Sequence, residues 1–279
     1  MKDIIIDTLL DGVKLLPFLF LTFLLMELIE HKFGNKLNKK LTKVNNFGPV
    51  IGSFLGIIPQ CGISASATNF YITRVISLGT LISVYLSTSD EMLPILISHN
   101  ASIFLIIKIL IVKFLCGLIF GITIDFITNK KEKEEIQSFC EIEDCDCDHG
   151  VLKSSIIHTI KTFVYILIIS FCLNIIFHYF GEELLEKLLM KNSPFGVIIT
   201  SLIGIIPNCS TSILLTELYL KNIISLGKLL SGLLINSGVG LLILIRFNKN
   251  KQENIKIVAI LLIISIFIGF IFDIFNIAF

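Results

Sequence analysis

The sequence predicts an all-α integral membrane protein made of two related halves, and two observations lead to this class. Hydrophobic residues make up 54% of the chain and the mean hydropathy is +0.88, which is more apolar than a water-soluble domain requires. Several apolar runs approach or exceed the length of about 18 to 20 residues that crosses a hydrocarbon core as a helix. They cover residues 15–26, 104–127, 163–177, 223–245 and 255–279.

An internal repeat is the second observation. The string Gly-Ile-Ile-Pro-Gln-Cys at 56–61 returns as Gly-Ile-Ile-Pro-Asn-Cys at 204–209, an offset of 148 residues from Pro59 to Pro207. A chance likeness between two Ile- and Leu-rich stretches does not supply matched polar and glycine residues at one offset. The matches continue at Ser64 and Ser212, Thr68 and Thr216, Gly79 and Gly227, and Asp125 and Asp273.

The repeat divides the chain into three parts. Residues 1–128 form the first membrane repeat, residues 129–155 a polar linker, and residues 156–279 the second membrane repeat. The linker contains the charged run Lys-Lys-Glu-Lys-Glu-Glu at 130–135, which is typical of a solvated segment.

Lysines in equivalent loops predict the orientation of the halves. The loop at 32–43 carries five lysines, whereas its counterpart at 181–192 mixes two lysines with three glutamates. Because cytoplasmic loops are enriched in Lys and Arg, the opposite bias predicts two inverted halves of a multi-pass protein of the cell membrane. The linker then lies in the cytoplasm and both termini lie outside, so each half crosses the membrane three or five times.

Residues 47–97 are too few for three full spans and too many for one. Pro59 lacks a backbone donor, and the polar string at 87–91 interrupts the next apolar run. We therefore expect broken or re-entrant helices. Opened backbone at membrane depth is tolerated where it is buried in protein or lines a cavity, which makes both interruptions candidate sites.

The first interruption offers ligands in both halves. Amide, thiol and hydroxyl groups recur as Gln60, Cys61 and Ser64, and as Asn208, Cys209 and Ser212. Thiolates are soft ligands and the oxygens are hard ones, so two such half-sites suit a transition metal or a metalloid. The alternative is that the cysteines are small packing residues beside a helix break.

The second interruption carries charge. Thr88, Ser89, Asp90 and Glu91 place two carboxylates beside an apolar run, whereas the counterpart begins with Asn236. Ionisable residues inside a membrane usually mark an ion path or a proton relay. The alternative is a hydrated loop at the interface. Glu217, matched by Asn69 in the first half, is either a further acid on the path or an interface anchor.

The linker groups Cys140, Cys145, Cys147 and His149 with several carboxylates. This spacing suits a divalent metal better than a structural zinc module, and the alternative is a disordered acidic loop. No tightly bound cofactor is predicted. A net charge of +1 gives no indication of nucleic acid, and the absence of a Walker motif disfavours ATP as the energy source.

The strings Pro-Gln-Cys-Gly at 59–62, Ser-Leu-Gly-Thr-Leu at 77–81, Thr-Ser-Asp-Glu-Met-Leu-Pro-Ile-Leu at 88–96 and Cys-Asp-Cys-Asp-His-Gly at 145–150 resemble the ten-helix heavy-metal exporters, also labelled manganese transporters. The resemblance covers essentially the whole chain and implies five short membrane segments per half and an efflux role. The repeated Pro-x-Cys also resembles organoarsenical permeases. There a second cysteine commonly follows, and residues 62–63 and 210–211 do not supply it.

These observations lead to a secondary exporter of a divalent or heavy-metal ion, with manganese favoured and a central site between the halves. Its partners are the lipid bilayer and the transported metal ion, protons are the candidate coupling ion, and an oligomer is compatible with the sequence. The alternatives are an organoarsenical or other small-solute permease, an intramembrane enzyme, and a non-transporting membrane subunit. The enzyme is disfavoured because no histidine has a repeat-supported position near Cys61.

Overall fold

The computed structural model describes residues 13, 16–17, 19–21, 23–24, 47–89, 92–128, 151–188 and 195–275. Every regular element within these ranges is helical, so the all-α prediction is confirmed for the described part of the chain. The helices are α3 (Gly48–Gly56), α4 (Cys61–Ile72), α5 (Leu78–Ser87), α6 (Met92–Ser98), α7 (Ile103–Thr128), α9 (Val151–Leu188), α10 (Gly196–Gly204), α11 (Cys209–Leu220), α12 (Leu226–Ile235), α13 (Val239–Phe247) and α14 (Lys251–Ile274).

The tandem repeat appears in the helix boundaries. The bounds of α3, α4 and α5 coincide with those of α10, α11 and α12 after the 148-residue offset of the sequence repeat. The short helix α6 corresponds to α13, and the long helix α7 corresponds to α14. The same local sequence pattern therefore produces the same order of short, short, short, short and long helices in each half.

Four stretches among the described residues are long and apolar enough to cross a membrane: Ile103–Thr128, Ser155–Cys172, Leu226–Phe247 and Lys251–Ile274. This supports a multi-pass membrane protein. The Leu226–Phe247 stretch, which is α12 followed by α13, differs from the others because 94% of its most apolar window is buried, against 22% to 28% elsewhere. The other three expose apolar side chains, whereas the α12–α13 stretch lies in the core together with α5.

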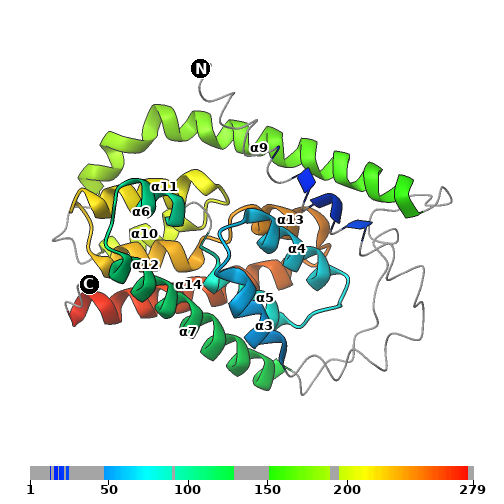
Figure 1. Ribbon diagram of the computed structural model, residues 1–279, viewed down its shortest axis with the longest axis horizontal. Coiled ribbons are helices and arrows are strands. Elements are labelled where there is room, and N and C mark those ends of the chain that lie inside the picture. The colour runs from blue at the N-terminus through cyan, green and yellow to red at the C-terminus, as the bar shows by residue number, and fades with distance from the viewer. Residues whose placement is uncertain are drawn as a thin grey trace.

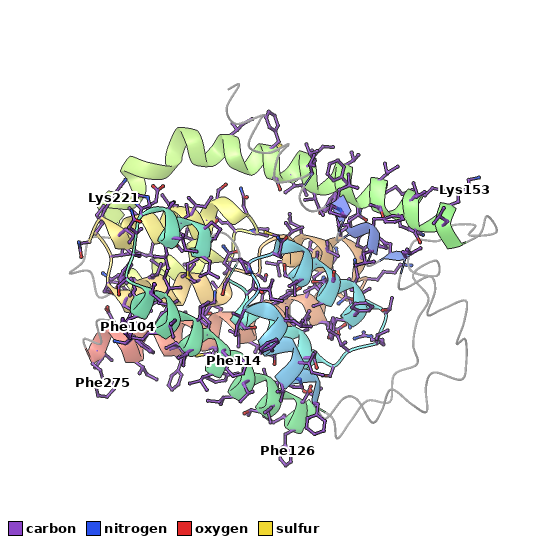
Figure 2. The ribbon with its side chains drawn as sticks, in the orientation of Figure 1. Phe104, Phe114, Phe126, Lys153, Lys221 and Phe275 are labelled. Atoms are coloured by element: carbon purple, nitrogen blue, oxygen red, sulfur yellow. The ribbon has the colours of Figure 1, made fainter. Side chains whose placement is uncertain are left out.

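The short helices lie between two outer layers. Helix α9 runs along one side of the molecule, and α7 and α14 lie on the opposite side (Figure 1). Phe126 on α7 and Phe275 after α14 project away from the body (Figure 2), as expected for side chains that face lipid. Near the N-terminus, the ring of Phe23 stacks on His158 of α9 with ring centroids 5.9 Å apart.

Each half packs its own helices in the same way. Helix α5 packs against α3 and α7, and α12 packs against α10 and α14. A side chain on Gly79 of α5 would collide with the carbonyl oxygen of Gly121 on α7, so the close approach of these helices requires glycine.

Two reciprocal contacts cross between the halves, beside smaller contacts of α5 with α12 and α14. Helix α4 of the first half packs against α13 of the second, and α11 of the second half packs against α6 of the first. In each crossing, a helix that follows the first break meets a helix that follows the second break of the other half. The halves are therefore interlocked.

Candidate functional site

The first predicted interruption is present in both halves. Helix α3 ends at Gly56 and α4 begins at Cys61, and α10 ends at Gly204 before α11 begins at Cys209. Gln60 and Asn208 occupy the N-cap positions in extended backbone, each directly after a proline. The amide oxygen of Asn208 accepts a hydrogen bond from the Ser210 N–H at 3.3 Å, so this side chain caps α11.

The second interruption is also present, and its described residues are buried. Helix α5 ends at Ser87 and α12 ends at Ile235. Thr88 and Ser89 after α5 are buried, as are Asn236 and Ser237 after α12. The chain turns at Gly238, whose φ of 54° is readily adopted by glycine, before α13 begins. The helical backbone is therefore interrupted inside the core at equivalent points of the two halves.

The structure brings two predicted residues of the second half together. The side-chain amide of Asn236 donates to the carbonyl oxygen of Asn208 at 3.4 Å, and its oxygen accepts from the N–H of Gly238 at 2.9 Å. The first and second breaks of this half are thus joined by one buried amide.

Cys61 and Ser64 lie on α4, the helix that crosses to α13. Cys61 is buried, and the Ser64 hydroxyl donates to the Cys61 carbonyl at 2.9 Å. The hydroxyl of Thr68 lies 2.5 Å from the Tyr85 hydroxyl and 3.2 Å from the Gly240 carbonyl of α13. The first-half residues therefore line the junction between the halves.

The equivalent helix α11 carries Ser212, which is buried, and Glu217, which is half-buried. Cys209 is the first residue of this helix. Thr216 donates its hydroxyl hydrogen to the Ser212 carbonyl at 2.6 Å, which repeats the bond from Thr68 to Ser64 in α4.

Several predicted site residues lie outside the described part of the chain. Asp90 and Glu91 of the second interruption are two of them. The other four are the linker residues Cys140, Cys145, Cys147 and His149. Within the described ranges, no group of three or more His, Cys, Asp and Glu side chains is placed to hold a metal ion.

Sequence reasoning missed Lys113. This side chain is 1% exposed on α7, and its ammonium group donates to the Thr88 carbonyl and, at 3.1 Å, to the Leu233 carbonyl of α12. The available signal was a lysine inside the apolar run at 104–127 whose counterpart in the second half is Leu261.

Asn69 is the counterpart of Glu217 in the first half, and nothing in the sequence marks it as a site residue. Its side chain is fully buried on α4, and neither its amide nitrogen nor its amide oxygen has a hydrogen-bond partner. A buried amide without partners is unusual in a packed helix, because such a group loses its hydrogen bonds to water on burial.

An ion pair between the halves was also missed. Arg74, in the loop after α4, donates to both carboxylate oxygens of Glu253 in the first turn of α14, at 2.7 and 3.1 Å. The Tyr71 hydroxyl and, at 3.2 Å, the Asn248 amide also donate to this carboxylate. A bidentate Arg–carboxylate pair with two further donors fixes the ends of α4 and α14 together.

Long apolar helices and a buried core with polar breaks define a multi-pass membrane protein. The model of a family described as "Putative, 10TM heavy-metal exporter" matches residues 1–178 and 160–278 of this chain. The chain belongs to that family, and the description is that of a transporter. No curated protein and no solved structure matches the chain.

Proposed function

We propose that this chain is a secondary exporter of a divalent or heavy-metal cation, with manganese favoured, and that the cation passes through a central site between the halves. The observation that carries the proposal is the buried stretch of α12 and α13. It has the composition of a membrane span, yet it lies inside the protein and is opened at Asn236 to Gly238. Transporters use such interruptions of buried helices to present backbone and polar side chains to a solute.

An inverted arrangement of the two repeats is part of the proposal. The reciprocal crossings of α4 with α13 and of α11 with α6 are the contacts that a pseudo-two-fold axis would generate. The opposite lysine bias of the equivalent loops supports the same arrangement. In this arrangement each half contributes about five membrane segments, some of them broken or re-entrant. The linker is then cytoplasmic, and both termini are outside.

The proposed path joins the two interruptions. Its oxygen groups favour a hard cation such as manganese, and its thiols would accept a softer one. The carboxylates of Asp90 and Glu91 would supply negative charge or exchange a proton for the metal. The path residues are Gln60, Cys61, Ser64, Thr88, Ser89, Asp90, Glu91, Asn208, Cys209, Ser212, Glu217 and Asn236.

A secondary role falls to the linker. Its thiols, carboxylates and imidazole would collect or sense metal on the cytoplasmic side. Deleting residues 140–149 is expected to lower the metal sensitivity of export while membrane insertion is kept. Unchanged transport and unchanged metal sensitivity would remove the linker from the mechanism.

A second candidate is a permease for an arsenical or another small solute without positive charge. The buried ammonium of Lys113 beside Thr88 favours it, because a fixed positive charge in a low-dielectric interior repels a divalent cation. The carboxylates of Asp90 and Glu91 would instead attract a cation. The solute panel described next distinguishes the two kinds of cargo.

The test is the cellular content of manganese, zinc, iron, cobalt, copper, arsenite and methylated arsenite in a sensitised host. Wild type is compared with Asp90→Asn and with Cys61→Ser, and Cys172→Ser is the matched control because this cysteine is exposed on α9. A lowered content of one metal cation that Asp90→Asn abolishes supports metal export and names the cargo. A lowered content of an arsenical alone supports the permease. If the content of no solute in the panel changes although the protein is present in the membrane, both candidate functions are wrong.

A further inference from the structure

Lys113 connects the ends of two helices that belong to different halves. It lies on α7 of the first half, and its ammonium group contacts the carbonyl of Thr88 after α5 and the carbonyl of Leu233 in α12. These two contacts are to backbone oxygens inside the protein, where the lysine side chain is almost completely buried.

These two oxygens are available because their helices end there. Helix α5 ends at Ser87 with Thr88 as its C-cap, and α12 ends at Ile235, so Leu233 lies in its last turn. The last four carbonyls of a helix have no helical N–H to accept, and they carry the negative end of the helix dipole. Two such ends that converge on one point form an environment for a cation, as half-helix ends do in other transporters.

The repeat shows that the fold itself does not require a charge at this position. The counterpart of Lys113 is Leu261 on α14, which is buried against α12 in the equivalent packing of the second half. A buried ammonium carries a desolvation cost that must be offset by its surroundings. Helix packing alone therefore does not call for a charge at 113, whereas the carbonyls of Thr88 and Leu233 are suited to bind one.

We propose that the carbonyl ends of α5 and α12 form a monovalent-cation site shared by the two halves, and that the ammonium group of Lys113 is its resident cation. A tethered ammonium supplies hydrogen-bond donors and a full charge without the entropy cost of capturing a free ion. Transport by the wild type is then independent of Na⁺ and K⁺ at this site. The independence of transport from these ions rests on the proposed transport function. Binding of a cation at the carbonyl ends does not depend on that function.

Removing the tethered cation while leaving space for a free one tests the proposal. In Lys113→Ala, K⁺ or Rb⁺ should enter the vacated position between the two carbonyls. Thermal unfolding of the purified full chain in detergent is measured in KCl, RbCl and choline chloride at equal ionic strength. The expected result is that 200 mM K⁺ raises the Tm of Lys113→Ala by about 4 °C over choline, with no difference for wild type.

Three variants serve as controls. Leu261→Ala opens a cavity at the equivalent position of α14, and Lys108→Ala removes an exposed lysine from α7. Neither should respond to the identity of the cation. Lys113→Met fills the space with an apolar side chain, so its Tm should be lowered and should not recover in K⁺. A Tm of Lys113→Ala that is the same in K⁺, Rb⁺ and choline would overturn the proposal.

Asp90 follows Thr88 by two residues in the sequence, so a carboxylate could hold the added ion in place of the carbonyls. The K⁺ response is therefore measured again with Lys113→Ala combined with Asp90→Asn. Retention of the response assigns the ion to the carbonyl site, and its loss assigns the ion to the carboxylate and overturns the proposal.

The expression levels of the two Lys113 variants test the proposal even if too little protein is obtained for unfolding measurements. Cells contain K⁺, which should support folding of Lys113→Ala but not of Lys113→Met, so the alanine variant is expected to accumulate at least as well. The reverse order contradicts the proposal. These readouts require no cargo, and they remain valid if the metal-content panel removes the proposed transport function.

Discussion

The crossing of α4 with α13 and that of α11 with α6 are equivalent by the repeat but are built differently. Helices α4 and α13 are packed together more extensively than α11 and α6. At the first crossing, Gly240 of α13 lies so close to α4 that an added Cβ would be 2.9 Å from the Ser64 carbonyl oxygen. Its counterpart at the second crossing is Met92, a large side chain at the start of a helix of only seven residues.

The ion pair is restricted to the first crossing as well. Arg74 and Glu253 have Asn222 and Leu105 as their counterparts, so the second crossing has no equivalent pair at these positions. Both Arg74 and Asn222 adopt positive φ, at 62° and 59°, which shows that the loops are alike in backbone. The two halves thus share the same backbone fold, but the crossing of α4 with α13 is fixed by close packing and an ion pair, and the crossing of α11 with α6 lacks both of these features.

The largest effect is expected from Gly240→Met, which places the side chain of the second crossing into the first. The new side chain would overlap the Ser64 carbonyl and the Tyr85 ring, because both lie within contact of the glycine. Overpacking of this kind costs about 1 to 3 kcal/mol, and more where backbone atoms must move. Thermal unfolding in detergent measures the loss.

The matched control is Met92→Leu at the counterpart, an exchange of similar volume that should cost under about 1.5 kcal/mol. Equal losses at the two positions would mean that the crossings are constrained alike.

The next effect concerns the ion pair. Arg74→Ala leaves the Glu253 carboxylate, which is about 15% exposed, without its bidentate partner. The expected loss is about 1 to 3 kcal/mol, because a mostly buried charged acceptor is left incompletely paired.

Unfolding of Arg74→Ala, Glu253→Gln and the double variant measures the coupling. The double variant should lose less than the sum of the single variants, since both remove the same interaction. Full additivity would show that the pair contributes nothing to the crossing, and Lys221→Ala in the equivalent loop controls for loss of a surface charge.

Helix capping within each half should show the opposite behaviour, with both halves alike. Asp125 accepts from the Ser77 hydroxyl at 2.7 Å and from the Gly79 N–H at 2.8 Å at the start of α5. Asp273 accepts from the Ser225 hydroxyl at the start of α12.

Ser77 and Ser225 are the N-caps, so Asp125→Ala and Asp273→Ala should each cost about 1 kcal/mol, the usual size of a lost hydrogen bond. Unfolding midpoints in denaturant measure both. A loss confined to one half would mean that the asymmetry extends beyond the crossings.

The smallest effect is expected at the second interruptions. The Ser237 hydroxyl is buried without a hydrogen-bond partner, whereas the Ser89 hydroxyl donates to the Ser87 carbonyl at 3.2 Å. Ser237→Ala should be neutral or slightly stabilising, and Ser89→Ala should cost up to about 1 kcal/mol. A transport defect in Ser237→Ala with unchanged stability would instead place this hydroxyl on the solute path.

The sequence allowed prediction of those features that depend on local chemistry. Pro59 and Pro207 located the first breaks, and the 148-residue offset located the equivalent helices. The crossings could not be predicted, because the sequence pattern of an apolar helix face does not identify the helix that packs against it. The contacts of Lys113 and of Arg74 were missed for the same reason: their partners lie far away in the sequence, on helices whose packing is set by the whole fold.

The crossing of α4 with α13 has a consequence for synthesis at the membrane. The carbonyl of Gly240, which contacts the Thr68 hydroxyl, is translated 172 residues after it. At about 5 to 20 residues per second, the polar face of α4 has no α13 to cover it for roughly 10 to 30 s. During that interval the Thr68 hydroxyl is satisfied within the first half by the Ser64 carbonyl and the Tyr85 hydroxyl, so its hydrogen bonds do not require α13 to be made first.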